Sequence, residues 1–463
     1  MASRIETNEP KIKINVSGFG PFYGIQDNPT SKLMKRLKAE KQQKERQCVL
    51  GKIDIFETSA AGSLQQLTQL RQLTDTKRKV QPHRRDLWVH FGVNGSSNQF
   101  SFEKLCWNEA DFRCPDEQQW QPTKQPIDPT LSLSDCYETG FPISLLLFHF
   151  SQFPWTVGLS ENPGRFVCNW IYYQSCKLEL ENAISFKPTT TTTMTTMSES
   201  SNPKVLFVHV PPENVYSIDQ QHAFAMALFH FISKLELEEA FVKSIWDQLT
   251  GQNSALNSWW IRFRNHMTEP QRFYHGMSHV FHLLQLSSQY RSSLSKPNVV
   301  NWSIFFHDII YNPTSHTNES DSALLWNEFY NDAHSLLLDF SSDDAASVSQ
   351  MILATQSHTI AECPPNSDFA YFLDFDLLIL GSEFPDYVTY ARGIREEYRH
   401  VELDKYCSIR SQFLQNLIST SPVLFRCDSI QSAFGSRALT NLRAEISSLN
   451  NGHTLSLNRE IFQ

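Results

Sequence analysis

The feature that most constrains this chain is a pair of adjacent polar residues, His307 and Asp308, inside the apolar run 304–310. A buried imidazole and a buried carboxylate are both costly unless they are paired with each other or bound to a metal. The run therefore predicts a polar site inside the protein rather than an ordinary stretch of hydrophobic core.

A further histidine, His279, precedes this pair on a segment whose apolar residues recur at helical spacing (Val280, Leu283 and Leu284). Two packed helices would bring two imidazoles and one carboxylate to one point. Imidazole together with carboxylate suits zinc, iron, manganese or nickel. The pattern therefore predicts a metal centre between two helices.

Two more carboxylates, Asp374 and Asp376, interrupt the later apolar run 372–381. A site of His, His-Asp and a later Asp resembles the HD superfamily of metal-dependent phosphohydrolases, in particular a branch of predicted phosphohydrolases. The resemblance covers roughly residues 245–448. Its motifs are Arg272-Phe-Tyr-His, His307-Asp-Ile-Ile-Tyr-Asn-Pro, Asn318-Glu-Ser, Ala354-Thr-Gln-Ser-His358, Leu373-Asp-Phe-Asp-Leu, Ile394-Arg-Glu-Glu-Tyr398 and Asn441-Leu-Arg-Ala-Glu445.

This resemblance implies an all-α helical bundle that holds a divalent transition metal (Mn, Fe, Ni, Co or Zn) and hydrolyses a phosphorylated small molecule or nucleotide. The implied metal ligands are His279, His307, Asp308 and Asp376, with Asp374 as the alternative to Asp376. Asp376 is preferred, because a ligand Asp followed by Leu is the commoner pattern. His275 would share a helix face with His279 if the segment is helical, and could bind a phosphate or a second metal.

The first half of the chain alternates apolar strand patterns with helical patterns. Strands are predicted at 11–18, 49–56, 87–95 and 205–212, and helices from 31, at 64–73 and at 218–237. Such alternation is typical of an α/β fold with a mostly parallel sheet.

Three reactive side chains lie at or near strand ends, where sites form in such sheets. Cys168 follows a Gly-Arg turn that enters a helix, and both a helix N-terminus and a guanidinium favour a thiolate. His209 ends a strand just before two prolines, and Glu103 lies in a segment of mixed polarity. Cysteine, histidine and glutamate are the parts of a thiol-nucleophile triad.

The same half of the chain resembles pyroglutamyl peptidase I, a cysteine peptidase, over about residues 11–235. The matching segments are Gly18-Phe-Gly-Pro-Phe22, Asn28-Pro, His90-Phe-Gly-Val-Asn-Gly95, Phe102-Glu-Lys, Asn108, Pro115-Asp116, Gly164-Arg-Phe-Val-Cys-Asn-Trp-Ile-Tyr-Tyr173 and Phe207-Val-His-Val-Pro-Pro212. Two segments depart from the family pattern, 56–62 after the second strand and Asn162-Pro-Gly-Arg before the cysteine.

By that resemblance Cys168 is the nucleophile, His209 the general base and Glu103 the carboxylate that orients the base. Phe19 and Phe22 resemble the aromatic residues that hold the flat pyroglutamyl ring. The implied substrates are pyroglutamyl peptides, and the peptidase half needs no cofactor.

Length and composition bound the organisation of the chain. With 463 residues, two to four domains are expected. The boundaries predicted are 11–235, with a disordered Thr-rich insertion at 188–203, and 245–450. A net charge of −9 argues against binding of long nucleic acids, and no apolar stretch has the length of a membrane span. Nine cysteines without paired spacing predict reduced thiols and a cytoplasmic protein.

Together the two halves predict a bifunctional hydrolase, with one cysteine-type peptidase site and one metal-dependent phosphohydrolase site. The alternative is that only one domain is catalytic and the other is a nucleotide-sensing or scaffolding module.

Overall fold

The structure is a computed structural model that describes residues 11–22, 24, 26–43, 49–80, 84–185, 202–336, 340–357, 363–420 and 423–456. The chain divides into two compact units, residues 1–237 and 238–463, and each is considered by itself. The predicted Thr-rich insertion at 188–203 falls almost wholly outside the described residues.

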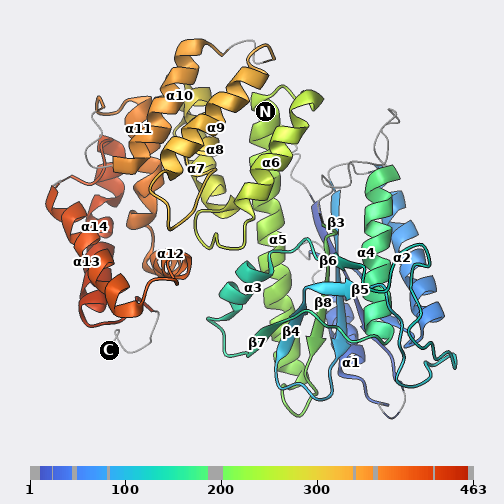
Figure 1. The fold of residues 1–463 in the computed structure, drawn as a ribbon. Coiled ribbons are helices and arrows are strands. Elements are labelled where there is room, and N and C mark those ends of the chain that lie inside the picture. Colours follow the sequence, from blue (N-terminus) through green and yellow to red (C-terminus); the bar gives the residue numbers. More distant parts are fainter. Residues whose placement is uncertain are drawn as a thin grey trace. The chain divides into compact units, whose positions relative to one another are not determined.

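The N-terminal unit is built on a six-stranded sheet with the order β2-β1-β3-β8-β4-β7 (Figure 1). Its strands are β1 (Lys11–Phe19), β2 (Leu50–Phe56), β3 (Arg84–Val93), β4 (Phe100–Glu103), β7 (Val157–Ser160) and β8 (Val205–Val210). Each neighbouring pair is parallel except β4 with β8. The predicted α/β class with a mostly parallel sheet is therefore confirmed.

Helices cover both faces of this sheet (Figure 1). One face packs against α1 (Pro29–Gln43), α3 (Ile143–Phe150) and α5 (Ile218–Leu249), and the other against α2 (Ala60–Val80) and α4 (Val167–Ser185). Because side chains alternate along a strand, Leu206 and Val208 of β8 point into the first core while Val205 and Phe207 point into the second. His209 shares the second face, where α4 lies.

The sequence pattern missed the short strands β4, β7, β5 (Leu105–Trp107) and β6 (Cys136–Glu138). Each has only three or four residues, so a repeating pattern has no room to develop. The helix predicted to end at 237 continues instead to Leu249, as the end of α5.

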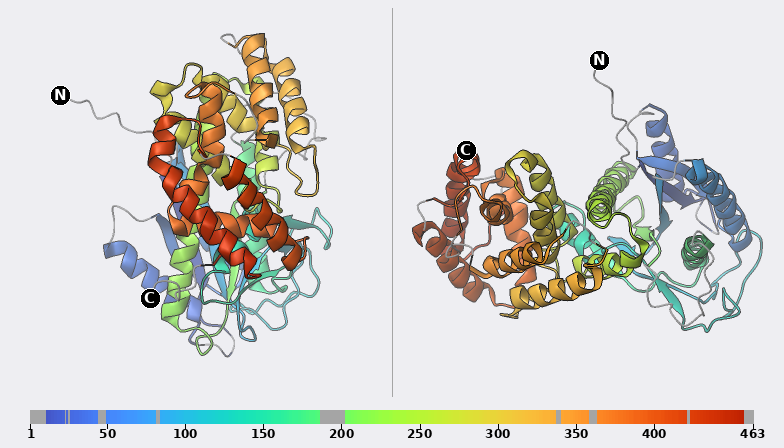
Figure 2. Two further views of the ribbon diagram at one scale, coloured as in Figure 1. Left: turned by 90° about the vertical axis from the view of Figure 1, so that its left-hand side faces the viewer. Right: turned by 90° about the horizontal axis from the view of Figure 1, so that it is seen from above.

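The described part of the C-terminal unit contains helices and no strand (Figures 1 and 2). Its α-helices after α5 are α6 (Asn257–Met267), α7 (Met277–Gln289), α8 (Pro297–Phe306), α9 (Asn318–Ala333), α10 (Ser342–Ala354), α11 (Asp368–Leu377), α12 (Phe384–Glu397), α13 (Leu403–Thr420) and α14 (Asp428–Asn450). Its core contains large buried aromatic rings, among them Trp246, Trp302, Trp326 and Phe329. The prediction of a helical unit is confirmed, while the HD type of bundle stays a prediction.

None of the helices in the described ranges combines the length and the apolar character that crossing a membrane requires.

Candidate functional site

The three residues predicted for the thiol triad meet on one side of the N-terminal sheet. Strands β4 and β8 run antiparallel, and Ser101 of β4 stands directly opposite His209 of β8. Glu103, two residues farther along β4, reaches the imidazole diagonally, and its Oε1 lies 2.6 Å from Nδ1 of His209. Glu103 is buried, although its mixed sequence segment is typical of a solvated glutamate.

The environment of His209 favours its charged form. Burial lowers the pKa of this imidazole, but hydrogen bonds to the Cys168 sulfur and to the Glu103 carboxylate outweigh burial and raise the pKa to about 10. The histidine therefore joins the other two residues in one hydrogen-bonded line. An imidazolium beside a cysteine is the kind of neighbour that makes the sulfur nucleophilic.

Cys168 lies in the first turn of α4, where the free backbone N–H groups of a helix stabilise negative charge. The guanidinium predicted to assist it, that of Arg165, lines the same cavity as Cys168 and is also bound by other side chains. Arg165 donates from Nε to Glu109 at 2.8 Å and from Nη1 to Asn162 Oδ1 at 2.8 Å. The helix end and His209 both place positive charge beside the sulfur.

Gly92 of β3 leaves the space that the Cys168 sulfur occupies beside the sheet. A Cβ atom built on Gly92 of β3 would lie 3.0 Å from the Cys168 Sγ and 2.8 Å from Cζ of Phe207. Neither distance leaves room for a methyl group without movement. Gly92 therefore lets the sulfur approach the strand backbone closely.

The triad opens into a cavity of about 540 Å³, which Phe19 and Phe22 also line. Sequence reasoning missed a third aromatic residue of this wall, Phe166, whose ring centroid lies 6.2 Å from that of Phe22. Its position two residues before Cys168 was the available signal. Flat aromatic walls beside a nucleophile suit a flat, mostly apolar ring as ligand.

The turn that carries Phe19 and Phe22 is fixed by the start of α1. Asn28 donates from Nδ2 to the Gly20 carbonyl at 2.9 Å and accepts the N–H of Thr30 at 3.0 Å. The Thr30 hydroxyl in turn accepts the N–H of Phe19 at 2.9 Å. All three hydrogen bonds are buried, so the cavity wall is held in place before any ligand binds.

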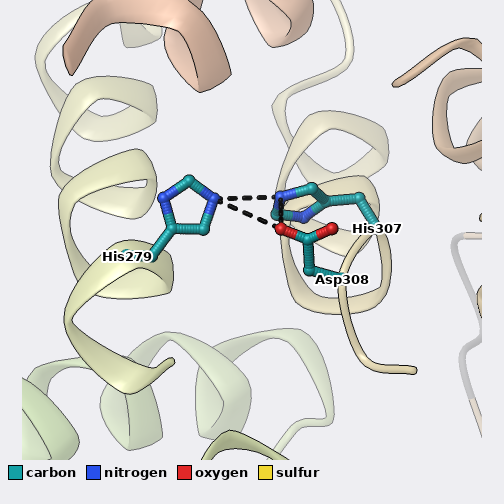
Figure 3. A group of neighbouring side chains, drawn as sticks. All are labelled: His279, His307 and Asp308. Carbon is teal, nitrogen blue, oxygen red and sulfur yellow. Dashed lines mark hydrogen bonds and ion pairs between the residues drawn. The ribbon is translucent and has the colours of Figure 1, made fainter. Parts of the chain in front are cut away.

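In the C-terminal unit three of the predicted metal ligands, His279, His307 and Asp308, also come together (Figure 3). His279 projects from α7 toward His307, which follows the end of α8, and the two Nε2 atoms lie 3.1 Å apart. Oδ2 of Asp308 lies 3.1 Å from Nε2 of His307, and Oδ1 of Asp376 lies 3.2 Å from Nε2 of His279. The two remaining His–Asp distances between these atoms are both 3.7 Å.

These separations fit a shared metal ion. Ligand atoms at about 2.0–2.2 Å from one metal are roughly 3–3.7 Å apart at angles between 90° and 120°. The His307 Nδ1 lies 3.0 Å from the Ile304 carbonyl oxygen, an arrangement that leaves Nε2 as the ligand atom. Two imidazole and two carboxylate donors match transition metals of the predicted range.

The surroundings shift the pKa values of the two imidazoles of the cluster in opposite directions. Burial lowers the pKa of His279. Burial also lowers the pKa of His307, but the charges and hydrogen bonds of Asp308 and Asp376 have a larger effect and raise it. Two Nε2 atoms 3.1 Å apart cannot both carry a proton, so at least one of them presents a lone pair.

The two candidate aspartates of α11 have different partners. Asp374 is fully buried, and its two oxygens accept the backbone N–H groups of Arg426 and Cys427 at 2.8 and 2.7 Å. Asp376, and not Asp374, lies beside the imidazoles. His275 does not share a helix face with His279 as expected, because α7 begins only at Met277.

Comparison with known proteins finds matches in the pyroglutamyl peptidase family. Residues 12–188 match the model of the pyroglutamyl peptidase family. Pyrrolidone-carboxylate peptidase of Bacillus subtilis is 29% identical over 164 residues, which are 35% of this chain and 68% of that protein. The Streptococcus pyogenes protein of the same name is 25% identical over 217 residues, or 47% of this chain and 86% of that protein.

Among solved structures, the pyrrolidone carboxyl peptidase of Fervidobacterium islandicum is 20% identical, with a TM-score of 0.36 over 48% of this chain and 99% of that chain. The Pyrococcus furiosus enzyme is 18% identical, with a TM-score of 0.37 over 49% of this chain and 100% of that chain. The match to the family model and the sequence relatives place the N-terminal region, residues 12–188, in the pyroglutamyl peptidase family, and the chain is a hydrolase of the cysteine-peptidase type.

Proposed function

We propose that the N-terminal unit removes pyroglutamate from the N-terminus of peptides. The observation that carries this proposal is the line of Glu103, His209 and Cys168 at the edge of an aromatic-walled cavity. The cavity takes the flat ring between its aromatic residues and leaves the first peptide bond beside the sulfur.

The chemistry follows from the three side chains. The Cys168 sulfur forms a bond to the pyroglutamyl carbonyl carbon, and His209 gives its proton to the leaving amine as the C–N bond breaks. Water then attacks the thioester, His209 takes up the proton of the water, and pyroglutamate leaves. Glu103 holds the imidazole through Nδ1, so that Nε2 serves the sulfur.

A fluorogenic pyroglutamyl amide tests this function. We expect amine release by the wild type, loss of release after iodoacetamide, and no release by Cys168→Ala with an unchanged circular dichroism spectrum. Cys136→Ala removes an exposed cysteine of the same unit and serves as the matched control, with full activity expected. Robust release by Cys168→Ala would show that another residue is the nucleophile.

For the C-terminal unit we propose metal-dependent hydrolysis of a phosphate ester or nucleotide. The specific observation that favours it is that the Nε2 atoms of two buried imidazoles lie 3.1 Å from each other and 3.1 to 3.7 Å from the oxygens of two carboxylates. His279, His307, Asp308 and Asp376 would hold the ion. When bound, the metal would activate water and polarise a phosphoryl oxygen.

Elemental analysis separates this function from the alternative of a sensing or scaffolding module. We expect about one transition metal per chain in the wild type. In Asp308→Ala we expect loss of metal and of any phosphatase activity, with peptidase activity retained. Equal metal in both proteins, or none after supply of manganese, nickel and iron, would mean that the cluster is structural and would favour the alternative.

A further inference from the structure

A buried tyrosine joins the helix that carries the nucleophile to the strand that carries the orienting carboxylate. Tyr172 follows Cys168 in α4 by four residues, so the two side chains lie on one face of the helix. The Tyr172 hydroxyl donates to the backbone carbonyl of Glu103 at 2.9 Å. Tyr172 is fully buried, so water does not compete for this hydrogen bond.

The direction of this hydrogen bond is fixed by its two groups. Burial raises the pKa of the Tyr172 phenol well above its ordinary value, so the hydroxyl keeps its proton. A backbone carbonyl can only accept. Loss of the hydroxyl would remove a donor from a carbonyl oxygen that lies inside the protein, where a lost hydrogen bond is not replaced by water at no cost.

The end of β4 depends on such a contact, because the sheet alone does not align all three members of the triad. Glu103 is the last residue of β4, which has four residues. Pairing of β4 with β8 sets the position of Glu103 relative to His209. It does not set the position of Cys168, since the sulfur lies on a helix. The Tyr172 hydroxyl links that helix to the end of β4.

The ring of Tyr172 also packs toward the strand that carries the base. Its centroid lies 5.7 Å from that of Phe207, which stands directly opposite Glu103 in the pairing of β4 with β8. The Phe207 centroid in turn lies 4.9 Å from the ring of His209. Through its hydroxyl and its ring, one side chain of α4 thus reaches both strands that hold the other triad members.

We propose that Tyr172 is a positioning residue of the thiol site, which holds the Glu103–His209 pair at the correct distance from Cys168. The inference rests on the peptidase function proposed above. A firmly held carboxylate stabilises the imidazolium beside the sulfur, and the imidazolium stabilises the thiolate. When Glu103 is held less firmly, the thiolate should form only at a higher pH.

Tyr172→Phe removes the hydroxyl and keeps the ring. Because one hydrogen bond of this kind changes a rate or an equilibrium by roughly three- to tenfold, we expect kcat for a fluorogenic pyroglutamyl amide to fall by that factor, with KM little changed. We also expect a higher pH midpoint for iodoacetamide alkylation, measured by mass spectrometry on the peptide that carries Cys168. The rise should be roughly half a unit to one unit.

Tyr173→Phe is the matched control for this variant. Tyr173 is the next residue of α4 and is equally buried, but its ring faces Tyr137 of β6, with centroids 4.8 Å apart. We expect Tyr173→Phe to keep the kcat and the alkylation midpoint of the wild type. Equal changes in both variants would mean that any buried hydroxyl of α4 has this effect, and would overturn the assignment.

A double-mutant cycle tests whether Tyr172 acts through Glu103. We expect Tyr172→Phe to lower kcat much less in a Glu103→Gln protein than in the wild type, because residues that act through one another are not additive. Equal fold losses in the two backgrounds would overturn the assignment. Circular dichroism and thermal unfolding report on the fold, and loss of the fold in Tyr172→Phe alone would make Tyr172 a structural residue.

The alkylation midpoint needs no substrate, so it tests this inference separately from the proposed function. If the wild type cleaves the amide and Tyr172→Phe matches it in kcat and in midpoint, only the role of Tyr172 is refuted. If the wild type cleaves no pyroglutamyl amide, the proposed function fails. A raised midpoint in Tyr172→Phe would then still support its role at the sulfur, and an unchanged midpoint would refute that role as well.

Discussion

His90 offers a test of how strongly the core of the N-terminal unit depends on a neutral imidazole. It lies in β3, fully buried, with its Nδ1 2.7 Å from the Ser17 hydroxyl and its Nε2 2.9 Å from the Ser175 hydroxyl. Burial, followed by the nearby charge of Arg71, lowers the pKa of His90 to about 3. The ring thus joins β1, β3 and α4 only in its uncharged form.

The sign of the pH dependence follows from proton uptake. In the unfolded chain His90 binds a proton below its ordinary pKa of 6.5, while in the folded chain it stays neutral down to about pH 3. Stability from this group is therefore complete above pH 6.5 and is lost as pH falls toward 3. At pH 5.0, with 1.36 kcal/mol per pKa unit, the loss is about 2 kcal/mol.

Hydrogen exchange, measured by mass spectrometry on peptides of β3, gives the opening free energy of this strand. A local measurement is needed because a chain of two units does not unfold in a single two-state step. The comparison is with His90→Gln, which keeps hydrogen-bonding groups but does not titrate. After correction for intrinsic exchange rates, the opening free energy of the wild type should fall between pH 7.5 and 5.0 by about 2 kcal/mol more than that of the variant. Equal pH dependence in the two proteins would refute the argument, because it would mean that His90 accepts a proton without unfolding.

Two further predictions concern the sites. Gly92→Ala should lower the rates of thiol alkylation and pyroglutamyl amide cleavage roughly tenfold or more, because the new methyl displaces the Cys168 sulfur. Gly95→Ala, whose methyl meets open space, should lose much less of either rate. Equal rates in both variants would contradict the packing argument. Asp376→Asn should lose metal, as measured by elemental analysis, whereas Asp374→Asn should keep it. Asp374→Asn should instead lower the free energy of unfolding by about 1–3 kcal/mol, because it weakens the hydrogen bonds to two backbone amides. Metal loss in Asp374→Asn alone would reverse the ligand assignment.

Sequence reasoning was strongest where a chemical requirement and a periodic pattern coincided. Long apolar runs gave the central strands β1, β3 and β8, and the polar interruptions within apolar segments located Cys168, His209 and His307. The choice between Asp374 and Asp376 was harder, because both interrupt one run. The structure separates them through tertiary partners, since the amides that hold Asp374 lie more than fifty residues farther along the chain.

What the pattern could not supply were features created by distant contacts. Strand β4 is too short to show alternation, so Glu103 looked solvated until pairing with β8 buried it against His209. The ion pair of Arg165 was hidden for a similar reason. A Gly-Arg turn before a helix predicts a nearby guanidinium, but the sequence does not reveal that Glu109 binds it.

The two sites offset the free-energy cost of burying an imidazole in different ways. Each chemistry can therefore be tested without the other. At His209 the charge is retained, because a carboxylate on one side and a sulfur on the other raise the pKa to about 10. At His279 burial prevails and lowers the pKa, so the ring offers a lone pair instead of a charge. An imidazolium serves proton transfer to a leaving amine, and a neutral imidazole serves metal binding. We therefore expect removal of any bound metal to leave the thiol site intact, and alkylation of the thiol to leave the proposed metal ligands intact.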